Sequence, residues 1–171
     1  MPNNYFHMTP TELKTGDVRS SSGFEQIDTR IEAALEKFRP KDKLSRLSSV
    51  YCAIWHDFTR TGVTSDGYIY LVDLQQPELH DLSWLAPMQA ALLREKHPSL
   101  KTSKKLAGPD WSDSMVEEHC RNYWSGKASA DPAWEAVAPK FTVVERLSDR
   151  LVQRSETADG WPQLRERFPK P

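Results

Sequence analysis

The first residues of this 171-residue chain that could do chemistry are two polar side chains near its start. His7 and Thr9 lie in a short aromatic segment, residues 4–9, which has the composition of a strand and ends before Pro10. Alternate residues of a strand project to one face, so the two side chains would present hydrogen-bonding groups together. The strand period therefore places the two side chains on one face, and a half-buried strand histidine is the ordinary interpretation of His7.

The other reactive residues do not form a recognisable cluster. His56–Asp57 and His80–Asp81 each offer half of a metal site, but His, Cys and acidic residues do not gather at ligand spacing, so we expect no metal. Cys120 directly follows His119, and adjacent helix positions point in different directions, so the pair is not a nucleophile and its base. The sequence contains neither GxGxxG nor GxxxxGK(S/T), the two commonest phosphate-binding loops.

Composition favours a folded domain over a nucleic-acid-binding or membrane protein. The 23 basic and 24 acidic residues give a net charge of −1, which argues against a large phosphate-neutralising surface. No apolar run approaches the ~20 residues that a spanning helix needs. Cys52 and Cys120 have apolar neighbours, and no segment resembles a signal peptide. These features predict two reduced, buried thiols and a cytoplasmic protein, a description that includes an effector delivered into a host cell.

Hydrophobic periodicity predicts strands and helices in mixed order. Ser22 and Glu25 have the spacing of a capping box at the start of the clearest helix, which ends before Pro40. The expected strands are residues 4–9, 47–54, 68–74 and 141–144, and the expected helices are residues 22–38, 82–96 and 110–126, with a basic loop at 100–109.

The order of these elements predicts an α+β fold, because strands stand at both ends with helices between them and no regular βαβ alternation occurs. Residues 1–147 form a single domain in this interpretation. Charge and proline dominate residues 148–171, which we expect to form a polar C-terminal helix or tail.

Several segments, taken in order, resemble motifs of the ADP-ribosyltransferases. Residues 7–17 (HMTPTELKTGD) resemble the first strand and turn of the histidine-tyrosine branch, which includes diphtheria-toxin-like and rifampin ADP-ribosyltransferase-like proteins. Residues 50–53 (VYCA) are similar to the second motif of that branch, and residues 67–72 (GYIYLV) to its following core strand. Residues 123–126 (YWSG) and 134–144 (WEAVAPKFTVV) resemble the segment that delivers a late carboxylate just before a strand.

This resemblance implies a fold, a donor and a set of residues. The fold is a small ADP-ribosyltransferase-like split β-sheet core with flanking helices, and the donor is NAD⁺ as co-substrate. For each tyrosine and for the glutamate, an ordinary core tyrosine or a solvated glutamate is the alternative. The implied NAD-binding residues are His7, Met8, Thr9, Tyr51 and Tyr70, and the implied catalytic residues are Glu135, Tyr51 and His7.

The chemistry gives these implied roles a reason. Cleavage of the nicotinamide–ribose bond passes through a cation spread over the ribose, as in glycoside hydrolysis, and the pyridinium leaving group needs no strong general acid. His7 and Thr9 would hold the adenosine ribose, and Tyr51 would form the wall of the nicotinamide pocket. Glu135 would hold the ribose 2′-hydroxyl and polarise the attacking group, an electrostatic task typically worth ~10²–10³ in rate.

The identity of the catalytic carboxylate stays open between two residues. The rifampin-type pattern places its acidic residue shortly after the Y-x-V strand, where Asp81 falls nearest. We favour Glu135, because residues 134–144 resemble the late motif of the wider superfamily. The chain also lacks the Gln/Glu-x-Glu pair of arginine-specific transferases, which argues against arginine as the acceptor.

The predicted function is mono-ADP-ribosyl transfer, a glycosyltransferase reaction typical of toxins and effectors. Its acceptor is a protein, a nucleic acid or a small molecule, and no membrane partner is expected. An NAD⁺ glycohydrolase would use the same residues with water as acceptor. A non-catalytic interaction domain on the same fold is the alternative from another class.

Overall fold

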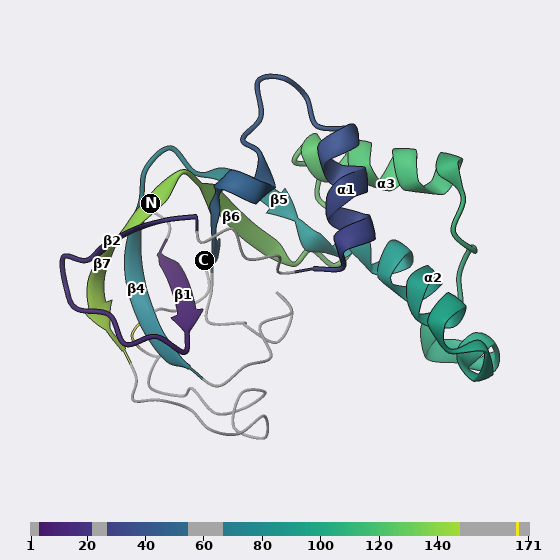
Figure 1. The fold of residues 1–171 in the computed structure, drawn as a ribbon, viewed down its shortest axis with the longest axis horizontal. Helices are drawn as coiled ribbons and strands as arrows, with labels where there is room; N and C mark the ends of the chain where they lie inside the picture. The colour runs from purple at the N-terminus through teal and green to yellow at the C-terminus, as the bar shows by residue number, and fades with distance from the viewer. Residues whose placement is uncertain (1–3, 22–26, 55–66, 148–166, 168–171) are drawn as a thin grey trace.

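The computed structural model describes residues 4–21, 27–54, 67–147 and 167 (Figure 1). Their strands form one seven-stranded sheet, antiparallel throughout, in the order β2-β7-β4-β1-β3-β6-β5. This sheet and its accompanying helices agree with the α+β class. The strands are β1 (Tyr5–Thr9), β2 (Val18–Ser20), β3 (Val50–Ala53), β4 (Tyr68–Leu74), β5 (Glu78–Asp81), β6 (Trp134–Ala138) and β7 (Lys140–Arg146).

The helices gather at the β5 end of the sheet, away from β2 and β7 (Figure 1). They are α1 (Thr29–Lys37), α2 (Ala86–Lys96) and α3 (Asp113–Trp124). Short 3-10 turns accompany them at Arg46–Ser48, Leu82–Leu85, Pro98–Thr102 and Lys104–Leu106. One apolar core lies between the helices, and the indole of Trp124 on α3 also donates to the Leu35 carbonyl of α1 at 2.9 Å. No helix in the described ranges has both the length and the apolar character to cross a membrane.

The sheet is curved around a second apolar core. Only Pro139 separates β6 from β7, yet β6 pairs with β3 and β5 whereas β7 pairs with β2 and β4. One residue cannot span the width of three intervening strands, so the sheet must bend until its two halves approach each other. The enclosed face carries a common core with side chains from β3, β4, β6 and β7, among them Phe141 and Val143.

Helix α1 starts later than the sequence predicts. Its N-cap is Asp28, whose side chain accepts a hydrogen bond from the Arg30 amide at 2.9 Å, and the helix begins at Thr29. The capping box predicted at Ser22 and Glu25 lies outside the described residues. Helices α2 and α3 agree with expectation, and Gly126 follows α3 at φ +68, a left-handed conformation that suits glycine at a helix end.

The strand prediction was accurate for β1, β4 and β7 and incomplete elsewhere. The expected strand 47–54 is shortened to Val50–Ala53, because Arg46–Ser48 forms a 3-10 turn. Strands β2, β5 and β6 were not predicted. Glu135 therefore lies inside a strand rather than just before one.

The predicted C-terminal tail and the His56–Asp57 pair fall almost wholly outside the described residues. Arg167 is the exception in the tail. Its guanidinium contacts the Glu145 carboxylate of β7 at 2.8 and 2.6 Å.

Both cysteines are free and buried, as predicted, and burial raises the pKa of each thiol, that of Cys120 to about 12. We therefore expect a reductant to leave the melting temperature unchanged, because no cross-link is lost. A thiol-reactive dye should modify the two cysteines only after the protein unfolds, because the dye reacts with the thiolate and burial disfavours that form. A fall in melting temperature of more than a few degrees on reduction, or two rapidly labelled native thiols, would contradict this result.

Candidate functional site

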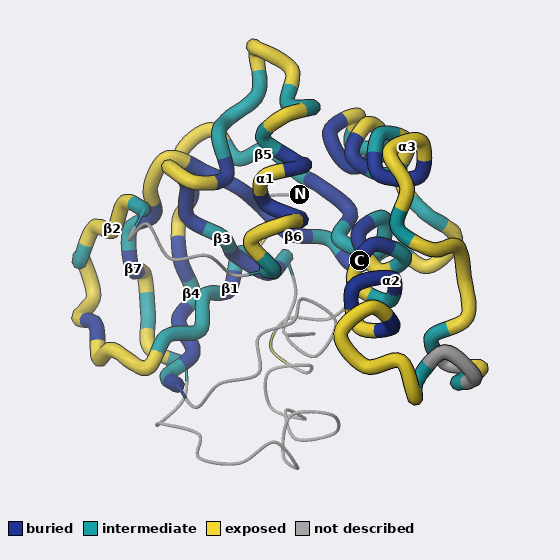
Figure 2. Tube along the Cα trace, turned by 45° about the vertical axis from the view of Figure 1, so that its right-hand side comes forward, coloured by how far each residue is buried: buried dark blue, intermediate teal, exposed yellow. Residues whose placement is uncertain are grey.

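Three of the predicted site residues come from neighbouring strands. His7 lies on β1, Tyr51 on β3 and Glu135 on β6, and these strands are consecutive in the sheet. Glu135 pairs in register with Ala53, two residues after Tyr51. Strand β6 is largely buried (Figure 2). Residues separated by more than a hundred positions in the sequence thus lie on three neighbouring strands of one sheet.

The ladder between β1 and β3 is much shorter than the ladder on the other side of β1. Between β1 and β4 the register runs from Tyr5 to Thr9, but between β1 and β3 it consists of Phe6 opposite Ala53. Beyond that pair the His7 ring makes the next contact, with Nδ1 at 3.0 Å from the Tyr51 carbonyl oxygen. The β1–β3 ladder therefore ends beside His7, and this end of the ladder is called the opening below.

The contact with Tyr51 determines the tautomer of His7. A carbonyl oxygen can only accept, so Nδ1 carries the hydrogen, and in the neutral ring Nε2 is left as an acceptor. Burial lowers the pKa of His7, opposed in part by the bond to the Tyr51 carbonyl. The His7 ring also packs on the Phe141 ring, with centroids 4.5 Å apart. The neutral imidazole therefore offers Nε2 as a hydrogen-bond acceptor at the opening.

The side chains around this opening emerge on opposite faces of the sheet. His7 is in register with Tyr70, whose side chain belongs to the enclosed core. Glu135 and Tyr51 alternate onto the other face, because Ala53 faces the same way as its cross-strand partner Phe6. The structure brings the three strands together, but it does not place all the predicted side chains on one surface.

The remaining predicted binding residues differ in accessibility. Tyr70 is completely buried, and its hydroxyl accepts a hydrogen bond from the Leu13 amide at 2.8 Å, which is the role of a core tyrosine. Thr9 is partly exposed, and its hydroxyl accepts from the Thr11 amide at 3.2 Å. Met8 is half-buried on the opposite face, against the small core around Phe6.

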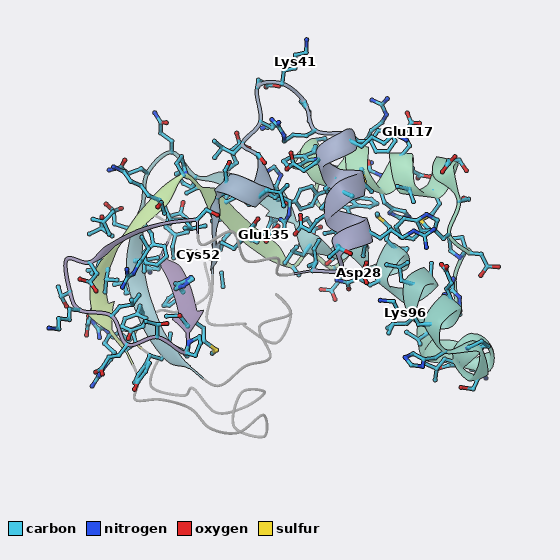
Figure 3. All side chains as sticks on the ribbon, viewed as in Figure 1. Asp28, Lys41, Cys52, Lys96, Glu117 and Glu135 are labelled. Carbon is cyan, nitrogen blue, oxygen red and sulfur yellow. The ribbon has the colours of Figure 1, made fainter. Side chains whose placement is uncertain are left out.

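A buried arginine that sequence reasoning missed is the neighbour of Glu135. The Arg46 guanidinium contacts Glu32 of α1 through Nε, at 3.0 Å to Oε2, and through Nη2, at 3.2 Å to Oε1. Its third nitrogen, Nη1, donates to Glu135 Oε1 and to the Tyr123 hydroxyl of α3. One side chain thus joins α1, α3 and β6 at the boundary between helices and sheet, where Glu135 is labelled in Figure 3.

The backbone of Arg46 is held as firmly as its side chain. Its amide donates to Glu36 Oε1 at 2.9 Å, and its carbonyl accepts from the Tyr51 hydroxyl. The guanidinium also lies over the Tyr51 ring, 4.6 Å from the centroid. Tyr51 is therefore a support for Arg46 on one side, and it stays half-buried rather than enclosed.

The cluster is electrostatically unbalanced, with one cation against two carboxylates. Burial raises the pKa of Glu32, opposed by the charge and hydrogen bonds of Arg46. Burial would lower the pKa of Arg46, but Glu135, Tyr123 and Glu32 together raise it well above its ordinary value, so it stays charged. Burial is also the main reason that the pKa of Tyr123 is raised, so this phenol remains a hydrogen-bond donor.

The two oxygens of Glu135 are used differently. Oε1 accepts from Arg46 Nη1 and from the Tyr123 hydroxyl, the latter at 2.6 Å. In the described part of the chain Oε2 accepts no hydrogen bond, yet it is not among the buried polar atoms that lack a partner. Oε2 therefore keeps contact with solvent, although the side chain as a whole is 4% exposed. One oxygen is anchored and the other remains available to a ligand.

Asp81, the alternative carboxylate, is fully occupied by the protein. Oδ1 accepts from the amides of Ser83 and Ala133, each at 2.9 Å, and Oδ2 accepts from the amide of Ser129 at 2.7 Å. Burial tends to raise the pKa of Asp81, but the bonds from Ser129, Ser83 and Ala133 outweigh it and lower the pKa. This carboxylate organises the 3-10 turn after β5 and the loop before β6.

His80 completes the surroundings of Glu135. It is in register with Glu135, and its ring stacks on Tyr123 with centroids 4.6 Å apart. Its Nδ1 donates to the Tyr123 carbonyl at 3.1 Å, and burial lowers its pKa. No group of three or more His, Cys, Asp or Glu side chains that could hold a metal ion occurs among the described residues.

Two sequence signals could have pointed to this cluster. Glu32 stands in the apolar stripe of α1, between Ile31 and Leu35, where a carboxylate needs a partner. Arg46 stands directly before a strand among small residues, in the segment LSRLSSV. Neither signal identifies the other residue, so the pairing could not be deduced.

Comparison with known proteins adds no assignment: no protein-family model matches the chain, and a search of the curated proteins returns no match.

The Asp81 network predicts a pH-dependent contribution to stability. In Asp81→Asn the amide nitrogen would meet the Ser129 amide, donor against donor, so we expect a loss of about 1–3 kcal/mol in the free energy of unfolding at pH 7. The pKa of Asp81 is lower in the folded state, so its contribution is present above the ordinary value of about 3.9 and is lost as pH falls through the folded value. Denaturant unfolding of wild type and Asp81→Asn from pH 7 to pH 3 measures the loss of stability and its dependence on pH.

The control is Asp110→Asn, at a carboxylate whose side chain is 88% exposed and 3.6 Å from Arg94. It should change stability far less. Equal effects of the two substitutions, or an Asp81→Asn deficit that grows toward low pH, would contradict the assignment.

Proposed function

We propose that this chain is a mono-ADP-ribosyltransferase that uses NAD⁺ as donor, and that its sheet is the split sheet of that fold. The observation that carries the proposal is the meeting of His7, Tyr51 and Glu135 on three consecutive strands, beside the point where the β1–β3 ladder opens. These are the residues that the sequence resemblance implies as donor-binding and catalytic groups.

The opening gives the opposite-facing side chains a way to serve one ligand. In an intact ladder the hydrogen-bonded backbone separates the two faces of a sheet. Beyond Phe6 and Ala53 no further β1–β3 pair occurs among the described residues, and a donor lying across the end of this ladder would meet His7 from β1 and Glu135 from β6.

Two hydrogen-bond acceptors at this site suit the hydroxyl groups of a ribose. Nε2 of neutral His7 is an acceptor, and so is Oε2 of Glu135. Both can accept hydrogen bonds from ribose hydroxyls. NAD⁺ would supply a glycosidic bond with a good leaving group, and Glu135 would place a negative charge beside the cation that develops when this bond breaks.

The choice of Glu135 over Asp81 follows from what their oxygens already bind. Both oxygens of Asp81 accept hydrogen bonds from backbone amides of the adjacent turn and loop. Glu135 keeps one oxygen without a partner in the described residues. Only the second arrangement leaves a carboxylate oxygen for a substrate.

The function is tested by nicotinamide release from NAD⁺ with and without cell lysate. Release that depends on lysate, with transfer of a labelled ADP-ribose group to a lysate component, supports the transferase. Release in buffer alone indicates a glycohydrolase that uses the same residues. If neither occurs and calorimetry detects no NAD⁺ binding, the proposal is wrong and the chain is a non-catalytic domain.

Glu135→Gln should lower turnover by about 10²–10³-fold, because it removes the charge that stabilises the ribosyl cation while keeping the shape of the side chain. The affinity for NAD⁺ should change little. The fold should survive, because Arg46 keeps its contacts with Glu32 and the cluster loses its excess negative charge. Single-turnover kinetics and NAD⁺ titration separate the two effects.

The matched control is Glu117→Gln, at a partly exposed glutamate of α3 that pairs with Arg121 at 2.7 Å (Figure 3). It should keep full turnover. If Asp81→Asn abolishes transfer while Glu135→Gln leaves it intact, the catalytic carboxylate has been assigned to the wrong residue.

His7→Ala should raise KM more than it lowers kcat, which is the opposite of the effect expected for Glu135→Gln. It removes a ground-state contact with the donor, so KM for NAD⁺ should rise by about tenfold or more, as expected for loss of ~1.4 kcal/mol of binding, while kcat falls less. His7→Gln retains an acceptor and should recover part of the affinity. A fall in kcat with unchanged KM would place His7 in the chemical step instead.

A further inference from the structure

The Arg46 guanidinium makes more contacts than its ion pair with Glu32 requires. Nε and Nη2 already satisfy Glu32, at distances from 3.0 to 3.3 Å. The additional contacts of Nη1 with Glu135 and the Tyr123 hydroxyl bring a second carboxylate into the same buried cluster. With both carboxylates ionised, the cluster carries one uncompensated negative charge.

An uncompensated buried charge is a poor way to stabilise a fold. Well-packed apolar side chains often serve stability as well as a buried ion pair does, and a charge without a full partner costs several kcal/mol. The unbalanced cluster is explained if the negative charge on Glu135 serves the proposed reaction. Its Oε1 is then fixed by two donors, while Oε2 accepts no hydrogen bond from the described residues.

We propose that Arg46 and Tyr123 are positioning residues that hold Glu135 as an oriented anion, with Oε1 anchored and Oε2 presented to the substrate. This inference rests on the proposed function. Arg46 acts from the turn before β3, where Glu36 and the Tyr51 hydroxyl hold its backbone, and Tyr123 acts from α3. The orientation of the carboxylate thus depends on the docking of the helices onto the sheet.

The contributions of Tyr123 and Arg46 can be tested by separate substitutions. Tyr123→Phe removes one of the two donors to Oε1 and leaves every contact of Arg46 with Glu32 and Glu135. Arg46→Lys retains a positive charge but has one nitrogen, which cannot contact Glu32 and Glu135 in the way a three-nitrogen fork does. The first variant should fold normally, and the second tests the fork itself.

Five elements contribute the charged surroundings of Glu135: α1, the 3-10 turn at Arg46–Ser48, β3, β5 and α3. The charged or titratable groups facing Glu135 are Glu32, Arg46, Tyr51, His80 and Tyr123. Of these, Arg46 and Tyr123 are the two that donate to it.

The experiment measures kcat and KM for NAD⁺, with melting temperatures, for wild type, Tyr123→Phe and Arg46→Lys. Tyr123→Phe should lower kcat about tenfold with KM within about twofold, and Arg46→Lys should lower kcat further, because each removes a donor that fixes the orientation of Glu135. A purely structural role would lower the melting temperature and leave the kcat of the folded variant unchanged.

The matched control is Arg94→Lys. Arg94 is also buried, and its Nη1 and Nη2 donate to the carbonyls of Leu106 and Pro109. It should lower the melting temperature without changing kcat or KM. An active wild type and an unchanged kcat for Tyr123→Phe overturn the positioning role alone. A wild type that neither binds nor cleaves NAD⁺ overturns the proposed function, and the positioning role falls with it.

Discussion

The structure depends on the contacts of a single guanidinium group. Arg46 joins α1 through Glu32, α3 through Tyr123 and β6 through Glu135, and its side chain is completely enclosed. Removing one partner from such a buried pair typically costs about 3–5 kcal/mol, because the remaining charge cannot be solvated. The helices and the sheet have largely separate apolar cores, so this polar contact, together with that of His80 with Tyr123, contributes to their relative position.

The short ladder beside His7 lies inside the curved part of the sheet. Strands β6 and β7 are joined by Pro139 alone, which forces the two halves of the sheet toward each other around Phe141 and Val143. Strands β1 and β3 lie between these halves, and they keep a single register pair, Phe6 with Ala53. The His7 ring packs against Phe141 and bonds to the Tyr51 carbonyl. The same core that bends the sheet therefore also orients the histidine.

The sequence predicts the elements that carry their own periodicity and misses those that depend on distant partners. Strand β4 is apolar over most of its length and α3 has a regular buried stripe, so both were found. Strands β5 and β6 contain His80, Asp81 and Glu135, whose burial contradicts every local rule. The burial of Glu135 is possible because Arg46, 89 residues away, supplies a compensating charge. No window of the sequence contains both.

The same limit applies to the two candidate carboxylates. Each stands in an ordinary sequence context, and each is buried, so neither composition nor burial distinguishes them. The distinction lies in the oxygens, because Asp81 accepts from three backbone amides whereas Glu135 accepts through Oε1 alone. A carboxylate whose oxygens are all bound within the protein can shape a loop but has nothing left to offer a substrate. A carboxylate with one anchored and one available oxygen is both oriented and able to bind, and orientation without full satisfaction is what electrostatic catalysis requires.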